Sequence, residues 1–308
     1  MEIFYGIDEF AKHCKCATCV AVGTFDGLHI GHRLIVEKLV DTAKVHNLKS
    51  VILTFDPHPR KVLFPDCNLN LILSPEEKVE VFATTGIDYL VVHQFDKNFA
   101  SIKSDDFMRD VLVGKLGMKY LVSGFNNHFG CDRMGDNEVL KQYGQRFGFG
   151  VSRLDAAMLN GISASSTLVR NALLDGNVEE AASILGYSYY ISGKVVHGRH
   201  IGTQIGFPTA NIQPDCADKL IPKTGVYSAE LQVDGRLYKS VVNIGDNPTV
   251  SDSGITTIEA YMVDFEGNIY GKYVRVYLYR WLRDQKKFAD LMQLKSAIQN
   301  DIAQVVGA

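Results

Sequence analysis

The sequence has no long apolar run and no large excess of charge of one sign. None of its uninterrupted apolar segments approaches the roughly 20 residues that a membrane-spanning helix needs. The first residues, MEIFYGIDEFAKHCKC, lack the basic segment and apolar core of a secretion signal. The formal net charge of -3 gives no electrostatic reason to expect nucleic acid or an anionic membrane as a partner. We therefore expect a cytoplasmic protein that binds neither, and the sequence leaves a homo-oligomer open.

Cysteines are also few. Six cysteines in 308 residues are too sparse for a disulfide scaffold. Three of them, Cys14, Cys16 and Cys19, lie in the segment HCKCATC. A metal site is one interpretation of this spacing, but no second cysteine pair follows at the spacing of a zinc ribbon. Because the segment leads directly into an apolar strand, we expect reduced thiols without metal, with a metal site as the alternative.

Strands and helices alternate through the first half of the chain. Apolar residues at helical spacing predict helices, and short apolar runs predict strands. The expected strands are residues 20–23, 51–55, 89–93 and 120–124, and the expected helices are residues 31–45, 75–84, 105–116 and 137–147. This alternation predicts an α/β fold with a doubly wound parallel sheet that is covered on both faces.

After two short predicted helices, residues 166–174 and 178–185, strands follow one another directly. Residues 227–233 and 237–244 alternate in polarity around Asp234-Gly235, a strong hairpin signal. Residues 257–264 and 273–279 repeat the pattern, which predicts a small antiparallel sheet or barrel. The C-terminal helix that closes it has one predicted apolar face, made of Phe288, Leu291, Met292, Ile298, Ile302 and Val305. We place the boundary at residue 186, which gives domains of residues 1–186 and 187–308.

The segment GTFDGLHIGH, residues 23–32, lies between a predicted strand and a predicted helix. Gly27 and Gly31 let the backbone turn tightly and approach a ligand. The free amides and the positive dipole end of a helix start favour phosphate. His29 and His32 can donate hydrogen bonds to a polyphosphate whose charge shifts as a bond breaks. Helix capping is the alternative for these imidazoles, but two histidines in a glycine-rich strand-to-helix turn favour the phosphate site.

This turn resembles the HxGH signature of the nucleotidyltransferase superfamily, and its longer form resembles the FAD synthetase branch. Residues 54–59, TFDPHP, are similar to that branch's TFxPHP motif, and residues 165–170, SSTLVR, to its SSTxxR motif. Hydroxyls and amides at a helix start, with an Arg one turn later, make an anion site for the β- and γ-phosphates. An ordinary Ser/Thr cap with a solvated Arg is the alternative for the last motif.

The resemblance implies the residues of an FMN adenylyltransferase site. The implied catalytic residues are His29, His32, Asn126 and Arg170. The implied binding residues lie in the same motifs: Gly23, Phe25, Asp26, Gly27, Gly31, Phe55, His58, Pro59, Phe129, Ser165, Ser166 and Thr167. Asn126 and Phe129 belong to GFNNHFG, residues 124–130, which is similar to the family's G-x-(D/N)-F-x-F-G pattern, with Asn127 in place of a Phe. A structural role is the alternative for His58.

A second resemblance covers the C-terminal part. Residues 207–211, FPTAN, resemble the PTAN motif of riboflavin kinases, whose fold is a small six-stranded antiparallel β-barrel. The resemblance implies that Thr209 and Asn211 hold Mg²⁺ and ATP phosphates, which suits an oxygen-seeking cation. Glu259 occupies the position of the family's catalytic glutamate, which can orient the riboflavin hydroxyl and accept its proton. An exposed Glu on a strand is the alternative. The other implied binding residues are Gly198, Gly206, Pro208, Asn243 and Arg283.

Both resemblances together cover residues 15 to 305 and imply a bifunctional enzyme of flavin cofactor biosynthesis. Riboflavin plus ATP gives FMN plus ADP, and FMN plus ATP then gives FAD plus pyrophosphate, each with Mg²⁺. The segments Asp264-Phe265 and Tyr270-Gly271 agree with the riboflavin kinase pattern. Two alternatives stay open. One is a nucleotidyltransferase with another phosphate acceptor, and the other is a flavin-sensing protein whose departures at Asn127, Thr203 and Gln285 leave a site inactive.

Overall fold

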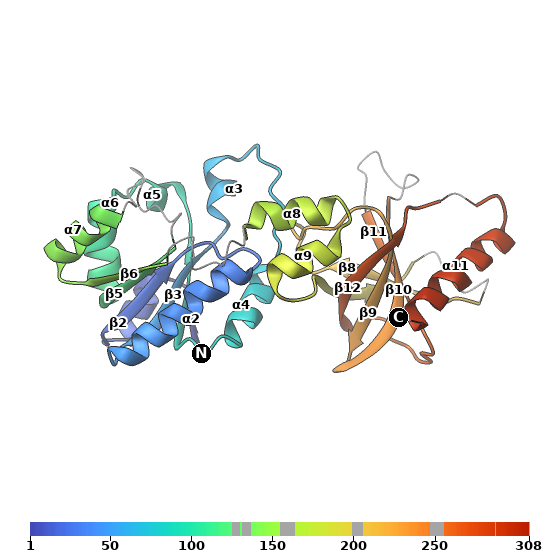
Figure 1. The fold of residues 1–308 in the computed structure, drawn as a ribbon, viewed down its shortest axis with the longest axis horizontal. Helices are drawn as coiled ribbons and strands as arrows, with labels where there is room; N and C mark the ends of the chain where they lie inside the picture. The colour runs from blue at the N-terminus through green and yellow to red at the C-terminus, as the bar shows by residue number, and fades with distance from the viewer. Residues whose placement is uncertain are drawn as a thin grey trace. The chain divides into compact units, whose positions relative to one another are not determined.

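The structure is a computed structural model that describes residues 1–124, 130, 137–154, 164–198, 206–246, 256–286 and 288–307 (Figure 1). The chain forms two units. Unit 1 consists of Met1–Leu69 and Pro75–Ala164, and unit 2 consists of Asn70–Ser74 and Ser165–Ala308. The functional boundary at residue 186 stays a prediction, because a division into compact units does not test where one activity ends.

Unit 1 contains a six-stranded sheet in which all neighbouring strands are parallel. Its strands are β1 (Glu2–Phe4), β2 (Thr18–Val22), β3 (Lys49–Asp56), β4 (Tyr89–Gln94), β5 (Met118–Ser123) and β6 (Gly150–Arg153). They lie in the order β1-β4-β3-β2-β5-β6, so the chain adds β3 and β4 on one side of β2 and later β5 and β6 on the other. Ligands of open α/β sheets bind at the carboxyl ends of the strands where the order reverses in this way. The predicted doubly wound parallel sheet is confirmed, and its switch point is β2.

Among the described helices of unit 1, the longer ones lie close to the predicted ranges, whereas Ile7–His13, Pro59–Leu63 and Lys97–Ala100 were not predicted. The described helices are α1 (Ile7–His13), α2 (Ile30–Val45), α3 (Pro59–Leu63), α4 (Pro75–Ala83), α5 (Lys97–Ala100), α6 (Ser104–Asp106), the π-helix η1 (Phe107–Lys115) and α7 (Asn137–Phe147). The helix predicted over residues 105–116 is present, mostly in the π-helical form of η1. The buried residues of η1 are Phe107, Met108, Val111 and Leu112. Their spacings of four and five also suit the wider turn of a π-helix, so periodicity over so few residues cannot separate the two forms.

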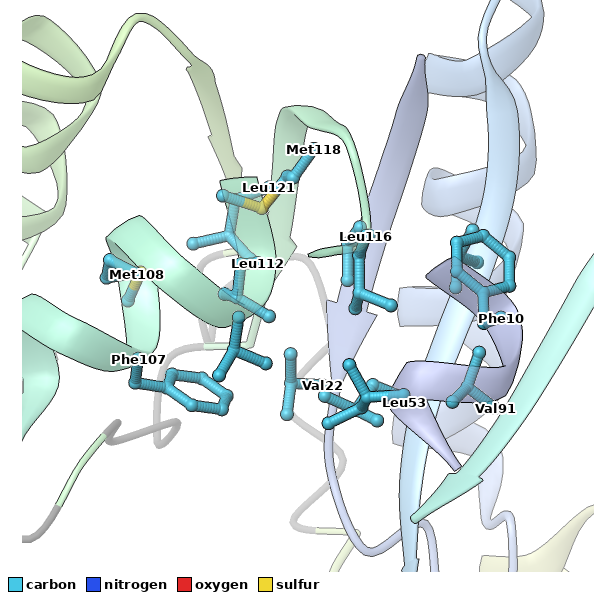
Figure 2. Close-up of a cluster of buried hydrophobic side chains, with 14 of the residues drawn as sticks. Phe10, Val22, Leu53, Val91, Phe107, Met108, Leu112, Leu116, Met118 and Leu121 are labelled. Carbon is cyan, nitrogen blue, oxygen red and sulfur yellow. The ribbon is translucent and has the colours of Figure 1, made fainter. Parts of the chain in front are cut away.

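A cluster of buried apolar side chains packs the strands against α1 and η1 (Figure 2). Val22 of β2, Leu53 of β3 and Val91 of β4 meet Phe10 of α1 and Phe107 of η1 in this cluster. All five residues of β2 are buried. Such continuous burial is typical of a parallel strand covered on both faces, and each large apolar side chain removed from water stabilises the fold by about 1.5–3 kcal/mol. The core thus fixes β2 and the turn that follows it.

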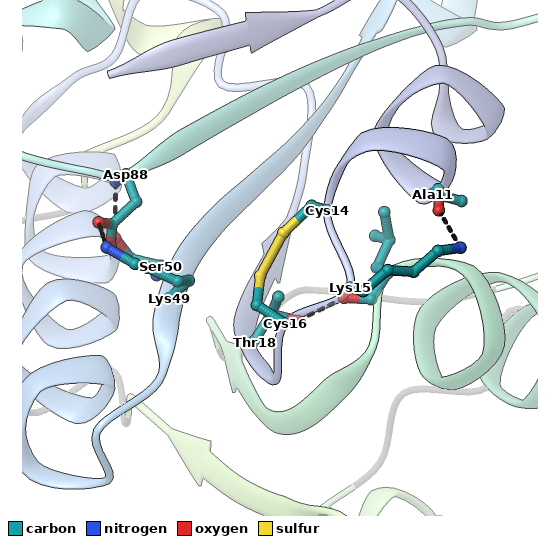
Figure 3. Close-up of a disulfide and its surroundings, with 9 residues drawn as sticks. Ala11, Cys14, Lys15, Cys16, Thr18, Lys49, Ser50 and Asp88 are labelled. Atoms are coloured by element: carbon teal, nitrogen blue, oxygen red, sulfur yellow. Dashed lines mark hydrogen bonds and ion pairs between the residues drawn. A yellow bond between two sulfur atoms is a disulfide. The ribbon is translucent and has the colours of Figure 1, made fainter.

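A disulfide joins Cys14 and Cys16 directly after α1 (Figure 3). Their Cα atoms lie 5.6 Å apart, within the usual range for a disulfide. The expectation of reduced thiols is therefore wrong for this pair, because the turn between α1 and β2 brings the two sulfurs together. Among the described cysteines, Cys19, Cys67 and Cys216 form no disulfide, and burial raises the pKa of the Cys19 thiol to about 12. The absence of metal from this segment stays a prediction.

Unit 2 contains a closed barrel of six antiparallel strands. They are β7 (Tyr190–Val196), β8 (Thr209–Pro214), β9 (Gly225–Val233), β10 (Arg236–Asp246), β11 (Thr256–Met262) and β12 (Tyr273–Arg283), in the order β10-β11-β8-β7-β12-β9. The predicted hairpin turn joins β9 to β10, with positive φ at both Asp234 and Gly235, the backbone of a type I′ turn. The predicted antiparallel barrel is confirmed.

In the described part of unit 2, three helices accompany the barrel. α8 (Ser166–Leu174) and α9 (Val178–Leu185) precede it with the predicted bounds, and α11 (Leu291–Val306) follows it and lies beside β10 in Figure 1. No helix in the described part of the chain is both long and apolar enough to cross a membrane.

Only part of α11 contacts the barrel. Ile302 and Val305 pack against Val226 of β9 and Val241 of β10. Leu291 and Met292 are 55% and 81% exposed, so the predicted apolar face is wrong at its N-terminal end. Only the later turns of this helix pack against the barrel. The apolar pattern in the sequence does not reveal where along the helix this contact begins.

Candidate active sites

The turn between β2 and α2 has an unfavourable backbone conformation that contacts with neighbouring residues must stabilise. Phe25, Gly27 and Leu28 have φ values of 47°, 81° and 34°. Positive φ costs free energy in residues other than glycine and persists where neighbouring structure fixes it. The side chains of Phe25 and Leu28 are buried, and the Thr54 hydroxyl donates to the backbone oxygen of Thr24 over 3.2 Å. Burial of these side chains and the hydrogen bond from Thr54 therefore stabilise the conformation of the turn.

Two glycines of this turn leave room for aromatic rings. A Cβ atom at position 23 would lie 3.1 Å from the Phe25 ring, and one at position 31 would lie 3.2 Å from the His29 ring. Both distances are tighter than ordinary van der Waals contact. Gly23 and Gly31 therefore let Phe25 and His29 lie directly against the backbone of the turn.

His29 caps α2 with one of its two ring nitrogens. The backbone N–H of His32 donates to Nδ1 of His29 over 3.4 Å. An accepting Nδ1 places the proton of the neutral ring on Nε2. The His32 ring stacks on the His29 ring with centroids 3.7 Å apart, and Nδ1 of His32 is buried without a hydrogen-bond partner in the described structure. The capping alternative thus occurs, but it uses only Nδ1 and does not compete with a donor role for Nε2.

Both imidazoles are neutral near pH 7. Desolvation lowers the pKa of His29 to about 4. Desolvation also lowers the pKa of His32 well below its ordinary value, and the nearby His29 and Lys78 lower it further. A bound polyphosphate would act in the opposite direction, because negative charge favours the imidazolium form. The pair can therefore serve as hydrogen-bond donors to an anion.

The end of β3 lies beside this turn, because β2 and β3 are neighbours in the sheet. His58 is buried and caps α3, with its Nδ1 accepting from the Arg60 N–H over 3.1 Å, and Pro59 begins that helix. Phe55 belongs to the core, with its ring centroid 5.4 Å from that of Phe95. The structural alternative for His58 thus accounts for one of its two nitrogens. A contact of Phe55 or Pro59 with substrate stays a prediction.

Two other predicted residues of the adenylyltransferase site cannot be placed. Asn126 and Phe129 lie outside the described residues, and their roles stay predictions. Gly124, just before them, follows β5, the other neighbour of β2. Asp26 is described, and its side chain is only 1% exposed. The carboxyl edge of β2, β3 and β5 thus collects most of the predicted motifs of unit 1.

The SSTLVR segment begins α8 in unit 2. Ser165 is the N-cap, and its Oγ accepts from the Leu168 N–H over 3.2 Å. Ser166 and Thr167 follow in the first turn, and Nε of Arg170 donates to the backbone oxygen of Asn70 over 3.0 Å. Ser165 therefore caps the helix, while phosphate binding by this helix start stays a prediction.

In unit 2, polar side chains line up across three neighbouring strands of the barrel. Glu259 of β11 lies opposite Asn211 of β8 on one side and opposite Asn243 of β10 on the other. Thr209 precedes Asn211 by two residues and shares its face of β8. The alternate positions on these strands are buried: Ala210, Val242, Ile244, Ile258 and Ala260. We call Thr209, Asn211, Asn243 and Glu259 the polar row. Residues directly opposite each other have Cβ atoms about 4.5–5.5 Å apart, so the row can act on one ligand.

The chemistry of the polar row fits a divalent cation. Hydroxyl, amide and carboxylate oxygens are the donors that Mg²⁺ prefers. A Cβ atom at position 198 would overlap the amide of Asn211, so Gly198 lets the chain after β7 approach that side chain. Gly206, at the end of the glycine-rich segment, has a φ of 88° in the left-handed region that favours glycine. Both glycines therefore allow backbone conformations next to the polar row that a larger residue would disfavour.

A pocket of about 190 Å³ adjoins the row in unit 2. Its walls include Val195, Pro208, Thr209, Met262, Phe265 and Tyr270. This mostly apolar lining, with the Thr209 hydroxyl at one wall, suits a flat ring system attached to a polar chain. The resemblance singled out the segments that contain Phe265 and Tyr270 but did not place them in the site. The sequence feature that could have identified them as pocket residues is the presence of two aromatic side chains in one predicted hairpin.

Two residues near the end of β12 have described partners. The Arg283 guanidinium binds the buried Asp301 carboxylate of α11, with N···O distances of 2.7 and 2.9 Å. Nε2 of Gln285 donates to Oδ1 of Asn243 over 3.1 Å. Arg283 therefore anchors α11 to the barrel, and its predicted contact with substrate stays a prediction. Gln285 touches the polar row itself.

Two family models match the chain in succession. The model of FAD synthetase matches residues 11–168, and the model of riboflavin kinase matches residues 185–307. The chain is 35% identical over 286 residues to the bifunctional riboflavin kinase/FMN adenylyltransferase of Pseudomonas fluorescens, covering 92% of this chain and 91% of the relative. It is 34% identical over 303 residues to the protein of the same name from Escherichia coli strain K12, covering 98% and 96%.

A solved structure also matches along nearly the whole chain. This crystal structure of a protein from Streptococcus pneumoniae, described as a macrolide-efflux protein, has a TM-score of 0.89 and 30% sequence identity, covering 99% of this chain and 98% of that one. The similarity shows that both share the succession of a parallel-sheet unit and a barrel unit.

Proposed function

The chain belongs to the family of bifunctional riboflavin kinases/FMN adenylyltransferases, and on this premise we propose how its residues divide the two reactions. The enzyme transfers the terminal phosphate of ATP to riboflavin, giving FMN and ADP. It then transfers AMP from ATP to FMN, giving FAD and pyrophosphate. We assign adenylyl transfer to residues 1–186 and phosphorylation to residues 187–308. The order of the two matching family models supports this division.

In adenylyl transfer, an FMN phosphate oxygen attacks the α-phosphorus of ATP while the bond to the β-phosphate oxygen breaks. Negative charge grows on the leaving pyrophosphate. Nε2–H of His29, the His32 ring and the first amides of α2 stabilise this charge. The capping bond of His29 supports the role, because it leaves the ring proton on Nε2. Asn126 and Arg170 add donors to the phosphates, with Ser165, Ser166 and Thr167 at the start of α8.

In phosphorylation, the 5′-hydroxyl oxygen of riboflavin attacks the γ-phosphorus of ATP while the bond to the ADP oxygen breaks. Glu259 orients this hydroxyl and accepts its proton. Thr209 and Asn211 hold Mg²⁺, which when bound neutralises charge on the phosphates. The observation that carries this proposal is the register of the polar row, in which Asn211 and Asn243 flank Glu259 on adjacent strands.

The pocket beside Thr209 takes the adenine ring of the phosphate donor. Thr209 belongs both to the polar row and to the pocket wall, so a nucleotide can place its base in the pocket and its phosphates along the row. The apolar walls suit a purine more than a sugar or a phosphate. We also propose that the enzyme acts in the cytoplasm on small molecules alone. The net charge of -3 gives no electrostatic reason to expect nucleic acid or an anionic membrane as a partner.

Tyr270→Ala tests the assignment of the pocket. This substitution removes one wall, and we expect the KM for ATP in FMN formation to rise about tenfold, the loss of about one aromatic contact. The KM for riboflavin and the formation of FAD from supplied FMN should not change. Tyr273→Ala, at a 69% exposed position on β12, is the matched control. A rise in the KM for riboflavin instead would assign the pocket to the flavin and overturn the proposal.

A further inference from the structure

A short segment of unit 2, Asn70–Ser74, comes from a distant part of the sequence. It lies between α3 and α4 along the chain, yet it belongs to unit 2. It forms a parallel bridge with the chain between β8 and β9: the Leu71 N–H donates to the Asp218 oxygen over 2.7 Å, and the Leu220 N–H donates to the Leu71 oxygen over 2.8 Å. All of its side chains except the first are buried. The segment is therefore fixed within unit 2 by both its backbone and its side chains.

Lys219 lies in the middle of this bridge and is itself buried, with only 4% of its surface exposed. Its Nζ donates to the backbone oxygen of Ile72 over 2.7 Å. The ammonium also lies over two aromatic rings, 4.6 Å from the centroid of Tyr189 and 5.3 Å from that of Tyr190. Burial of an ammonium costs free energy unless hydrogen bonds and aromatic faces compensate for the lost water. These contacts therefore hold the ammonium directly beside Asn70–Ser74.

The first residue of the segment contacts Arg170 of α8. Nε of Arg170 donates to the backbone oxygen of Asn70 over 3.0 Å. A guanidinium is planar, so a hydrogen bond at Nε fixes the plane in which its other N–H groups point. Helix α8 is tied to the same stretch of chain, because the Lys223 N–H donates to the Leu173 oxygen over 3.0 Å. Residues 218–223 thus hold both the helix that carries Arg170 and the segment that orients it.

We propose that Lys219 is a positioning residue for adenylyl transfer. Its ammonium holds the segment Asn70–Ser74 in place, and the Asn70 oxygen in turn orients the Arg170 guanidinium for the phosphates of ATP. The inference rests on the proposed function of Arg170. Lys219 lies within the residues that the riboflavin kinase model matches, yet it serves the formation of FAD. It acts through Arg170 and not by touching the substrates.

The first test measures FAD formation from supplied FMN and ATP by the full chain with Lys219→Met, which removes the charge and the donor. We expect kcat/KM for ATP to fall by about 10- to 100-fold, since a displacement of about 1 Å in a positioned group can cost about 10²-fold. The KM for FMN should stay within about threefold, because Arg170 acts on the other substrate. FMN formation from riboflavin should be unchanged, since Lys219 lies neither in the polar row nor in the wall of the pocket.

Two further variants separate positioning from general stability. Lys239 also donates to backbone oxygens of unit 2, those of Val305 and Val306 over 3.3 Å, so Lys239→Met is the matched control and should form FAD normally. Lys219→Arg keeps a charged donor and should recover at least half of the lost activity on a logarithmic scale. If Lys219→Met forms FAD normally, if both of its activities fall alike, or if Lys219→Arg recovers nothing, the proposal is wrong.

A double-mutant cycle with Arg170→Ala tests the route of the effect. If Lys219 acts through Arg170, the variant with both Arg170→Ala and Lys219→Met should lose no more FAD formation than Arg170→Ala alone. Losses that multiply would show independent roles and contradict the proposal. Normal FAD formation by Arg170→Ala would remove the proposed function of Arg170 itself. An impaired Arg170→Ala beside a normal Lys219→Met would remove only the role of Lys219.

Discussion

The two units arrange the residues that we propose for phosphate chemistry in different ways. In unit 1 the central residues, His29 and His32, lie within ten consecutive residues between a strand and a helix. In unit 2 the polar row joins Asn211, Asn243 and Glu259, which are distant in the sequence and meet through the register of three antiparallel strands. One site is thus a local turn, and the other is a product of strand pairing.

This difference decides how substitutions act. The turn of unit 1 has positive φ at Phe25, Gly27 and Leu28, so its side chains and its backbone geometry depend on one another. The polar row stands on regular strands whose alternate residues are buried, so an isosteric change there alters chemistry and little else. The predictions below test this contrast.

Replacing His29 and His32 together by Ala should have the largest effect. Removal of one donor to transition-state charge lowers a rate by about 10²- to 10³-fold, so we expect at least about 10⁴-fold slower FAD formation from FMN. FMN formation from riboflavin should be unchanged, because we assign it to residues 187–308. Chromatography of both flavin products measures the two rates. The control is the pair His13→Ala and His46→Ala at exposed positions, and loss of both activities in the folded double variant would break the two-site account.

Glu259→Gln should lower riboflavin phosphorylation by about 10²-fold or more, the usual contribution of a positioned base. The amide has the size of the carboxylate, so the barrel should keep its melting temperature and FMN adenylylation should persist. Glu179→Gln, at an exposed position of α9, is the matched control. Phosphorylation at the normal rate in Glu259→Gln would mean that another group accepts the proton.

Acid should destabilise unit 1 through His29. The pKa of His29 is about 4 in the folded chain and about 6.5 when unfolded, so between these values the unfolded state binds the extra proton. The free energy of unfolding should therefore fall by about 2 kcal/mol between pH 7 and pH 5 because of this residue.

His29→Asn removes the titration but keeps a residue that caps helices well. Urea unfolding of the full chain at both pH values should show a smaller acid loss in the transition of unit 1 for this variant. The transition of unit 2 should be the same for both proteins. Equal acid losses in wild type and variant would show that His29 is not the group responsible.

The Cys14–Cys16 disulfide should have the smallest effect. It closes a very short loop, so replacing both cysteines by Ser should change the free energy of unfolding by less than about 2 kcal/mol and leave both activities intact. Thiol titration before and after reduction should differ by two thiols per chain. Elemental analysis should give well below one zinc per chain, and a stoichiometric zinc would restore the metal alternative for this segment.

Sequence reasoning found the turn of unit 1 because its chemistry is contiguous. The strands around it were predictable from their short apolar runs. β1 and β6 were missed because three or four residues show no clear pattern. A helix was predicted over η1, although the sequence did not reveal its π-helical form. The disulfide was missed because two residues of separation do not reveal the fold of the chain between α1 and β2.

The polar row could be predicted only in part from the sequence. The resemblance named Thr209, Asn211, Asn243 and Glu259, but nothing in the sequence set the register that puts three of them side by side.

The most direct test of two separate sites is a mixture of the His29→Ala/His32→Ala variant with the Glu259→Gln variant. Given riboflavin, ATP and Mg²⁺, the first variant alone should accumulate FMN and the second alone should form almost no flavin nucleotide. In the mixture, FMN made by one chain should be adenylylated by the other, so that FAD forms at a rate set by the two intact units. A mixture of folded chains that accumulates FMN without forming FAD would contradict the account.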